Sequence, residues 1–141
     1  MSALTIRGSL RRVLADRLAR SPAATVVGLC AAWCDTCGQF QPLFERLARA
    51  RRNAVFVWLD IEDDNAVVGD IEVENFPALA VFRNGVPVFF GPTLPQEGPV
   101  GRLLAALTQR EPLAVPVPQE VAALPRRLAR LAEQPGTECG P

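Results

Sequence analysis

The chain contains no histidine and no lysine, so arginine supplies all fifteen of its basic residues. Without histidine, it cannot form a serine–histidine or cysteine–histidine couple for nucleophilic catalysis. It also lacks the imidazole ligand that many zinc sites use. Any acid–base chemistry must therefore come from carboxylates, thiols or water.

Long apolar runs and a net charge are missing as well. No stretch of the sequence is apolar over 18 residues or so, which predicts no membrane span. The first twenty residues lack the continuous apolar run of a secretory signal. The formal net charge is zero, so no overall field favours nucleic acid or anionic lipid. We expect a cytoplasmic protein that does not bind nucleic acid.

The arginine-rich start of the chain allows two interpretations. In "SLRRVLADRLAR" the apolar residues Leu10, Val13, Leu14 and Leu18 fall on one helical face. This pattern is typical of the first helix of a domain, which we prefer, but an organelle presequence has a similar pattern.

Charge is distributed unevenly along the chain. Residues 1–52 hold nine arginines and three acids, whereas residues 60–74 hold seven acids and no basic residue. Two solvated faces of opposite sign would explain this distribution, and so would a charged docking surface for a partner.

Cysteine is also scarce, and three of the four cysteines lie in "CAAWCDTC", residues 30–37. This stretch holds the C-x-x-C of a redox pair, or the C-x-x-x-C-x-x-C of a radical-enzyme iron–sulfur site, or simply buried thiols. A chain of 141 residues is too short for the barrel of a radical enzyme. A four-thiolate zinc site would need Cys139. We expect Cys30 to be a buried core thiol and Cys139 an exposed free thiol.

Around this stretch the sequence predicts a strand, a helix and a second strand. Residues 24–32 and 54–60 are apolar runs of the kind buried on both faces. Between them an amphipathic helix starts near Cys34 and contains Pro42, and its apolar side carries Phe40, Leu43, Phe44 and Leu47. The two strands should therefore be parallel and joined by a crossover.

The rest of the chain predicts further elements. "ALTI", residues 3–6, is predicted to form a short edge strand. The acidic stretch "IEDDNAVVGDIEVEN", residues 61–75, is predicted to hold a short helix. Strands over 78–83 and 86–90 flank an Asn-Gly turn, and a helix covers 99–110. We place one domain at residues 1–110. Residues 111–141 form a Pro-rich C-terminal tail, in which Pro125 could open a short helix.

Several motifs together make the chain similar to the thioredoxin family over about residues 3–110. Trp33 directly precedes Cys34, and Pro42 follows Cys37 by five residues. "NFPALAVFRNG" resembles the segment around the family's cis-proline, and Gly91 follows the last strand. The resemblance implies an α/β, thioredoxin-like three-layer fold. Its central mixed sheet would have four to five strands flanked by helices, with the Pro-rich C-terminal extension added.

The resemblance also implies a thiol–disulfide oxidoreductase that reduces protein disulfides and serves electron transport and cell redox homeostasis. Cys34, at a helix start, would be the nucleophile, because the helix dipole favours a thiolate there. Cys37 would complete the exchange. A redox-active Cys34–Cys37 disulfide would then be the only redox group, with no metal and no other cofactor. Disulfide-containing proteins would be the substrates, and a thioredoxin-reductase-type protein the electron donor.

Other residues take roles through the same resemblance. A cis Phe76–Pro77 bond and Trp33 would bind an extended substrate strand. Asp35 and Thr36 stand between the cysteines, where they would tune the redox chemistry. The family's buried Asp and nearby Lys are replaced by Gly28 and Trp58. Because that proton-transfer pair is absent, a chaperone or assembly factor that binds partners without redox turnover stays open as the alternative.

Overall fold

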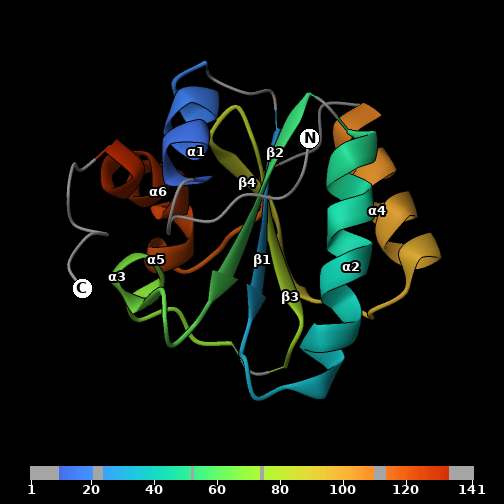
Figure 1. Ribbon diagram of the computed structural model, residues 1–141. Coiled ribbons are helices and arrows are strands. Elements are labelled where there is room, and N and C mark those ends of the chain that lie inside the picture. Colours follow the sequence, from blue (N-terminus) through green and yellow to red (C-terminus); the bar gives the residue numbers. More distant parts are fainter. Residues whose placement is uncertain (1–9, 21–23, 52, 74, 110–113, 134–141) are drawn as a thin grey trace.

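The computed structural model describes residues 10–20, 24–51, 53–73, 75–109 and 114–133. The predicted edge strand at residues 3–6 and Cys139 lie outside these described residues. Figure 1 shows a central sheet with helices on both of its faces. No helix among the described residues is long and apolar enough to cross a membrane.

The sheet has four described strands in the order β2-β1-β3-β4. The strands are β1 (Ala24–Cys30), β2 (Ala54–Asp60), β3 (Ala78–Arg83) and β4 (Val86–Pro92). Strand β1 pairs with β2 in parallel, whereas β3 is antiparallel to both β1 and β4. Both the predicted parallel crossover and the predicted mixed sheet are therefore confirmed.

The hairpin between β3 and β4 turns at Asn84 and Gly85, where the sequence predicts it. Their φ angles are 52° and 82°. Two successive residues with positive φ form the turn whose twist matches that of the flanking strands. Asparagine and glycine are the residues that adopt these angles at the lowest cost.

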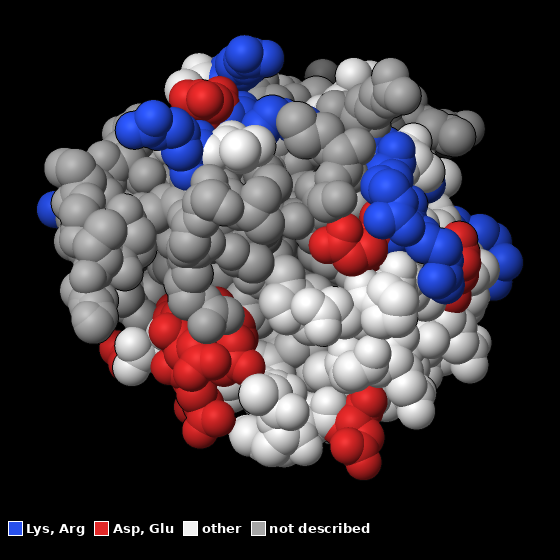
Figure 2. All heavy atoms as spheres, viewed as in Figure 1, with Lys and Arg blue, Asp and Glu red and all other residues white. Residues whose placement is uncertain are grey.

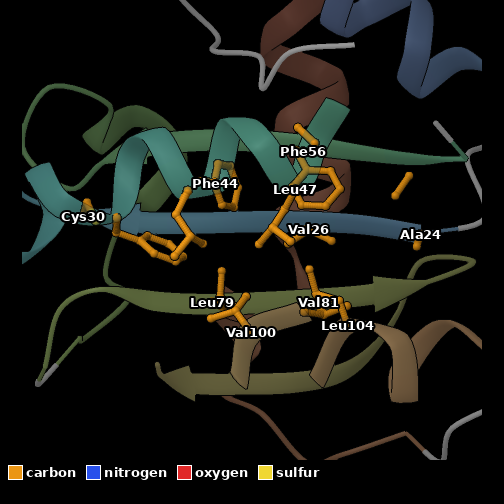
Figure 3. Close-up of a cluster of buried hydrophobic side chains, with 14 of the residues drawn as sticks. Ala24, Val26, Cys30, Phe44, Leu47, Phe56, Leu79, Val81, Val100 and Leu104 are labelled. Carbon is orange, nitrogen blue, oxygen red and sulfur yellow. The ribbon is translucent and has the colours of Figure 1, made fainter. Parts of the chain in front are cut away.

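Helices α2 (Asp35–Ala50) and α4 (Glu97–Gln109) cover one face of the sheet. Figure 3 shows apolar side chains of both helices pointing at the strands. The predicted helical face of α2 is buried, with Phe40, Leu43, Phe44 and Leu47 between 0 and 6% exposed. From α4, Val100 and Leu104 enter the same cluster, and Leu103 and Leu107 pack against it.

Gly28 lets α2 pack closely against the centre of β1. A Cβ atom at this position would lie 3.2 Å from two carbons of the Phe44 ring and 3.3 Å from the Trp58 ring. Phe44 in turn contacts the rings of Phe40, Phe56 and Trp58 at centroid distances of 5.3–5.6 Å. An aromatic cluster therefore fills the space where the resemblance would place a buried Asp and a Lys.

The opposite face of the sheet is covered by α1 (Leu10–Ala19), α3 (Asn65–Val68) and helices from the C-terminal segment. The C-terminal helices are α5 (Gln119–Ala122) and α6 (Leu124–Glu133). Three of their residues, Val121, Leu124 and Leu128, are 0% exposed in a core cluster shared with Leu14 of α1. Because these side chains belong to the core, residues 119–128 are built into the domain.

The segment before α5 crosses the sheet edge. The N–H of Val115 donates to the carbonyl of Pro87 in β4, at 3.0 Å. Pro125 then lies in the first turn of α6, where a missing N–H costs no helical hydrogen bond. The prolines of this segment therefore fit an extended stretch followed by a helix start.

Arginine side chains join helices to their neighbours on both faces. The Arg51 guanidinium donates to the carbonyl of Gly101 in α4, at 3.2 Å. The Arg127 guanidinium of α6 donates to the carbonyl of Val67 in α3, at 3.3 Å. Each bond ties a late element of the chain to an earlier one.

We expect Gly28→Val to destabilise the fold. Its Cβ would already press on the Trp58 ring and on the Phe44 ring, which is 1% exposed and packed in the core. Overpacking of this kind costs about 1–3 kcal/mol, to be measured by urea denaturation. Gly38→Ala is the matched control, because nothing lies within 4 Å of its Cβ position in α2. Equal stability of the two variants would contradict the packing described here.

A second substitution tests whether α6 belongs to the cooperative fold. Leu128→Ala removes a fully buried side chain, so we expect a loss of about 2–5 kcal/mol in the free energy of unfolding. Arg130→Ala, an exposed change on the same helix, should stay within about 0.5 kcal/mol of the wild type. A Leu128→Ala protein as stable as the control would show that α6 does not stabilise the domain.

Candidate active site

The start of α2 presents Cys34 at the molecular surface. Cys34 is the N-cap residue, with extended backbone angles, and its thiol is partly exposed. Its carbonyl accepts the Cys37 N–H at 3.1 Å, so Cys37 lies one turn further along. The N–H groups of Asp35 and Thr36, the first two residues of the helix, have no carbonyl one turn earlier in the helix to accept them, and they favour an anion at this end.

The disulfide of this structure joins Cys30 to Cys37, whereas the resemblance implies one between Cys34 and Cys37. Cys30 and Cys37 are 2% and 3% exposed, and their Cα atoms are 5.8 Å apart. Among the cysteines that the structure describes, Cys34 is the one with a free thiol. The expectation for Cys30 is therefore half right, because it is buried but it is not a free core thiol.

The geometry of β1 explains this pairing. Alternate residues of the strand, Ala24, Val26 and Cys30, point into the core cluster beneath α2. Cys37 points inward from the first turn of the helix above it, whereas Cys34 caps that helix and remains partly exposed. The alternation along residues 24–30 places Cys30 on the same face of the strand as Ala24 and Val26. Both faces of β1 are buried, so the sequence does not say that α2 covers this face.

The pKa of the Cys34 thiol is lowered from its ordinary value. The main cause is a hydrogen bond between its Sγ and the Thr36 Oγ1, 3.1 Å away. The hydroxyl donates this bond when the sulfur is a thiolate. Backbone N–H groups of Cys37 and Thr36 lower the pKa further, whereas partial burial and the Asp35 carboxylate raise it. The opposing charge of Asp35 is thus the weakest of these effects.

An aromatic pair flanks Cys34. Trp33 is 66% exposed, and its ring meets that of Phe76 edge to face, with centroids 5.6 Å apart. Phe76 precedes Pro77 through a cis peptide bond, as the resemblance implies. The Pro77 carbonyl accepts the Thr93 N–H at 2.9 Å. The ring contact brings the loop before β3 next to the start of α2, although about 40 residues separate the two in sequence.

The acidic stretch of the chain begins at the end of the sheet where β1 and β2 stop and where the cysteines lie. Cys30 and Asp60 are register partners at the ends of β1 and β2, and the acidic stretch starts at Asp60. Figure 2 shows acidic side chains gathered in the lower part of the visible face, and most of the arginines toward its upper part. The end of the sheet that carries the cysteines is therefore also rich in negative charge.

No metal centre is visible in the part of the chain that the structure describes. No group of three or more histidine, cysteine or acidic residues there could hold an ion. The four-thiolate alternative depends on Cys139, which lies outside the described residues.

Comparison with known proteins identifies the family. Residues 12–91 match the thioredoxin family model. The chain belongs to the thioredoxin family. It is 29% identical to a thioredoxin of Mycoplasmoides gallisepticum over 70 residues, or 50% of this chain and 70% of that protein. It is 32% identical to rabbit (Oryctolagus cuniculus) thioredoxin over 63 residues, covering 45% of this chain and 60% of the rabbit protein.

Solved thioredoxin structures share the fold. A point-mutant thioredoxin from Halobacterium salinarum superimposes with a TM-score of 0.61 at 24% identity, over 79% of this chain and 95% of that one. Thioredoxin O2 from Arabidopsis thaliana, in its oxidized state, gives a TM-score of 0.57 at 19% identity, over 76% and 95%. Family membership and the Cys30–Cys37 disulfide together support a thiol–disulfide oxidoreductase function.

The hydrogen bond from Thr36 predicts how the pKa of Cys34 responds to substitution. Thr36→Val should raise the pKa, because it removes the main group that stabilises the thiolate. Asp35→Asn should lower the pKa, because it removes a neighbouring negative charge. The measurement is the rate of iodoacetamide alkylation against pH in oxidised protein carrying Cys139→Ser, which leaves Cys34 as the free thiol. An unchanged midpoint in Thr36→Val would refute the assignment.

Proposed function

We propose that this thioredoxin-family chain reduces protein disulfides by dithiol–disulfide exchange through Cys34 and Cys37. The observation that carries the proposal is a partly exposed thiol at the N-cap of α2, with a lowered pKa and an exposed tryptophan beside it. Cys34 thus has the access, and Thr36 the hydrogen bond, that thiol–disulfide exchange requires.

The exchange takes two steps. The Cys34 thiolate attacks one sulfur of the substrate disulfide and forms a mixed disulfide, and the other substrate sulfur leaves as a thiolate. Cys37 then loses its proton to solvent and attacks the Sγ of Cys34. The second substrate sulfur leaves, and a Cys34–Cys37 disulfide forms. The substrate gains two electrons, and the two cysteines lose two.

Trp33, Phe76 and Pro77 would form the surface on which the substrate docks. The exposed Trp33 ring and the half-buried Phe76 ring meet edge to face next to Cys34. An extended substrate segment could lie against these rings and pair with the backbone before β3. Since Pro77 has no N–H, any donated hydrogen bond must come from its neighbours.

The cycle needs a second partner that supplies electrons. A thioredoxin-reductase-type dithiol protein would return two electrons to the oxidised cysteines. Such a cycle operates where other thiols are kept reduced, so we place it in the cytoplasm as part of electron transport and cell redox homeostasis. Asp35 and Thr36 would tune the exchange through the pKa of Cys34.

Substrate trapping tests the proposal. In Cys37→Ser the second step is blocked, so substrates should accumulate on Cys34 as mixed disulfides that dithiothreitol releases. Cys34→Ser should form no such adducts, and both variants should lose disulfide reductase activity down to background. The adducts are measured on non-reducing gels and by mass spectrometry.

The Cys34→Ser/Cys37→Ser double variant separates this proposal from the binding alternative. A chaperone or assembly factor would capture the same partners with both cysteines replaced, and without a covalent bond. Equal capture by the double variant, together with no adducts on Cys37→Ser, would overturn the proposed reductase function.

A further inference from the structure

Three cysteines, rather than two, lie around the start of α2: Cys30 and Cys37 belong to one buried cluster, and Cys34 packs against it. The proposed function ends with a disulfide between Cys34 and Cys37, yet the disulfide in the structure joins Cys37 to Cys30. Cys37 is bonded to the buried Cys30 in the structure, and in the proposed exchange it would bond to the partly exposed Cys34. The Cα separation of 5.8 Å between Cys30 and Cys37 lies within the usual range for a disulfide.

We propose that Cys30 is a third redox residue. It replaces Cys34 as the disulfide partner of Cys37, so that the disulfide moves from the protein surface to the interior. This inference rests on the proposed function, because it starts from the Cys34–Cys37 disulfide. In the step that we infer, the Cys30 sulfur gives its proton to solvent and attacks the Sγ of Cys37. The Cys34–Cys37 bond breaks, a Cys30–Cys37 bond forms, and Cys34 leaves as a thiolate. The exchange involves no net oxidation or reduction.

The surroundings of Cys34 favour this direction. A thiolate that is stabilised leaves a disulfide faster than one that is not. The Thr36 hydroxyl lies 3.1 Å from the Cys34 sulfur, and the backbone N–H groups of Thr36 and Cys37 also stabilise its thiolate. Cys30 is 2% exposed, so a thiolate would be costly at this position. Its sulfur is therefore more stable when it is bonded in a disulfide.

The burial of the new disulfide also determines how it can be reduced. With Cys30 and Cys37 at 2% and 3% exposure, an outside reductant has little access to either sulfur. Cys34 is partly exposed and lies one turn before Cys37, so its thiol can return the disulfide to the surface, where a donor can reduce it. Its thiolate attacks Cys37, Cys30 leaves and takes a proton, and the donor reduces the Cys34–Cys37 bond at the surface. The buried disulfide is thus a protected form of the oxidised protein.

Peptide mapping can follow the disulfide as it moves. The reduced Cys139→Ser protein is mixed with one equivalent of a peptide that contains a single disulfide, and samples are quenched in acid over time and alkylated with N-ethylmaleimide. Chymotrypsin cuts after Trp33, which separates Cys30 from Cys34 and Cys37. A Cys34–Cys37 bond then stays within one fragment, whereas a Cys30–Cys37 bond joins two. Mass spectrometry distinguishes the products.

We expect the Cys34–Cys37 bond first and the Cys30–Cys37 bond as the main final product, with maleimide on Cys34. Cys30→Ala should stop at the Cys34–Cys37 bond. If that variant fails to fold, the time course of the Cys139→Ser protein alone still tests the order. We also expect dithiothreitol to reduce the Cys30–Cys37 disulfide roughly tenfold more slowly in Cys34→Ser, because the exposed thiol is gone.

The outcomes separate this inference from the function beneath it. A bond that stays between Cys34 and Cys37 would overturn the role of Cys30 and leave the proposed reductase intact. A Cys30–Cys37 bond that forms equally fast in Cys34→Ser would show that the disulfide does not pass through Cys34, which also overturns the inference. If the peptide is not reduced and no bond forms among the three cysteines, the proposed function itself fails.

Discussion

The packing of α2 across β1 at Gly28 determines the geometry of the whole site. Because Gly28 has no side chain, the Phe44 ring lies at van der Waals distance from the strand, wedged against Trp58. This contact holds the first turn of α2 over the end of β1. Cys37 is thereby brought to Cys30, and Cys34 stays at the rim. A bulkier residue at position 28 would push the helix and the strand apart.

The same packing changes the chemistry available to the cysteines. An aromatic cluster occupies the space beneath α2 where the resemblance would place a buried Asp. In its place, the described residues provide a hydroxyl at Thr36, which bonds Cys34 directly. Stabilisation of the thiolate therefore comes from within the C-x-x-C segment, and proton exchange must involve solvent at the partly exposed rim.

The C-terminal segment has a structural role that its composition hides. Its prolines suggest an extended tail, yet its apolar residues complete the core opposite the site, next to α1 and the single turn of α3. The face that α3 is too short to cover is closed by α6. The two faces of the sheet are thus built differently: one carries the long helix that positions the cysteines, and the other is completed by helices of the C-terminal segment.

From the sequence alone, the strands, the crossover, the Asn-Gly hairpin and the buried face of α2 could be predicted, because each depends on a local period or on the preference of a single residue. The position of Cys34 at a helix start followed from the helical period, and the cis Phe76–Pro77 bond was implied by the resemblance to the thioredoxin family. The partner that Cys37 has in the structure was not predicted. Cys34 and Cys30 are three and seven residues away along the chain, so spacing favoured the nearer one. Only the docking of α2 on β1 determines which sulfur lies beneath the helix. The same holds for α6, because burial of its apolar face depends on a surface assembled from distant parts of the chain.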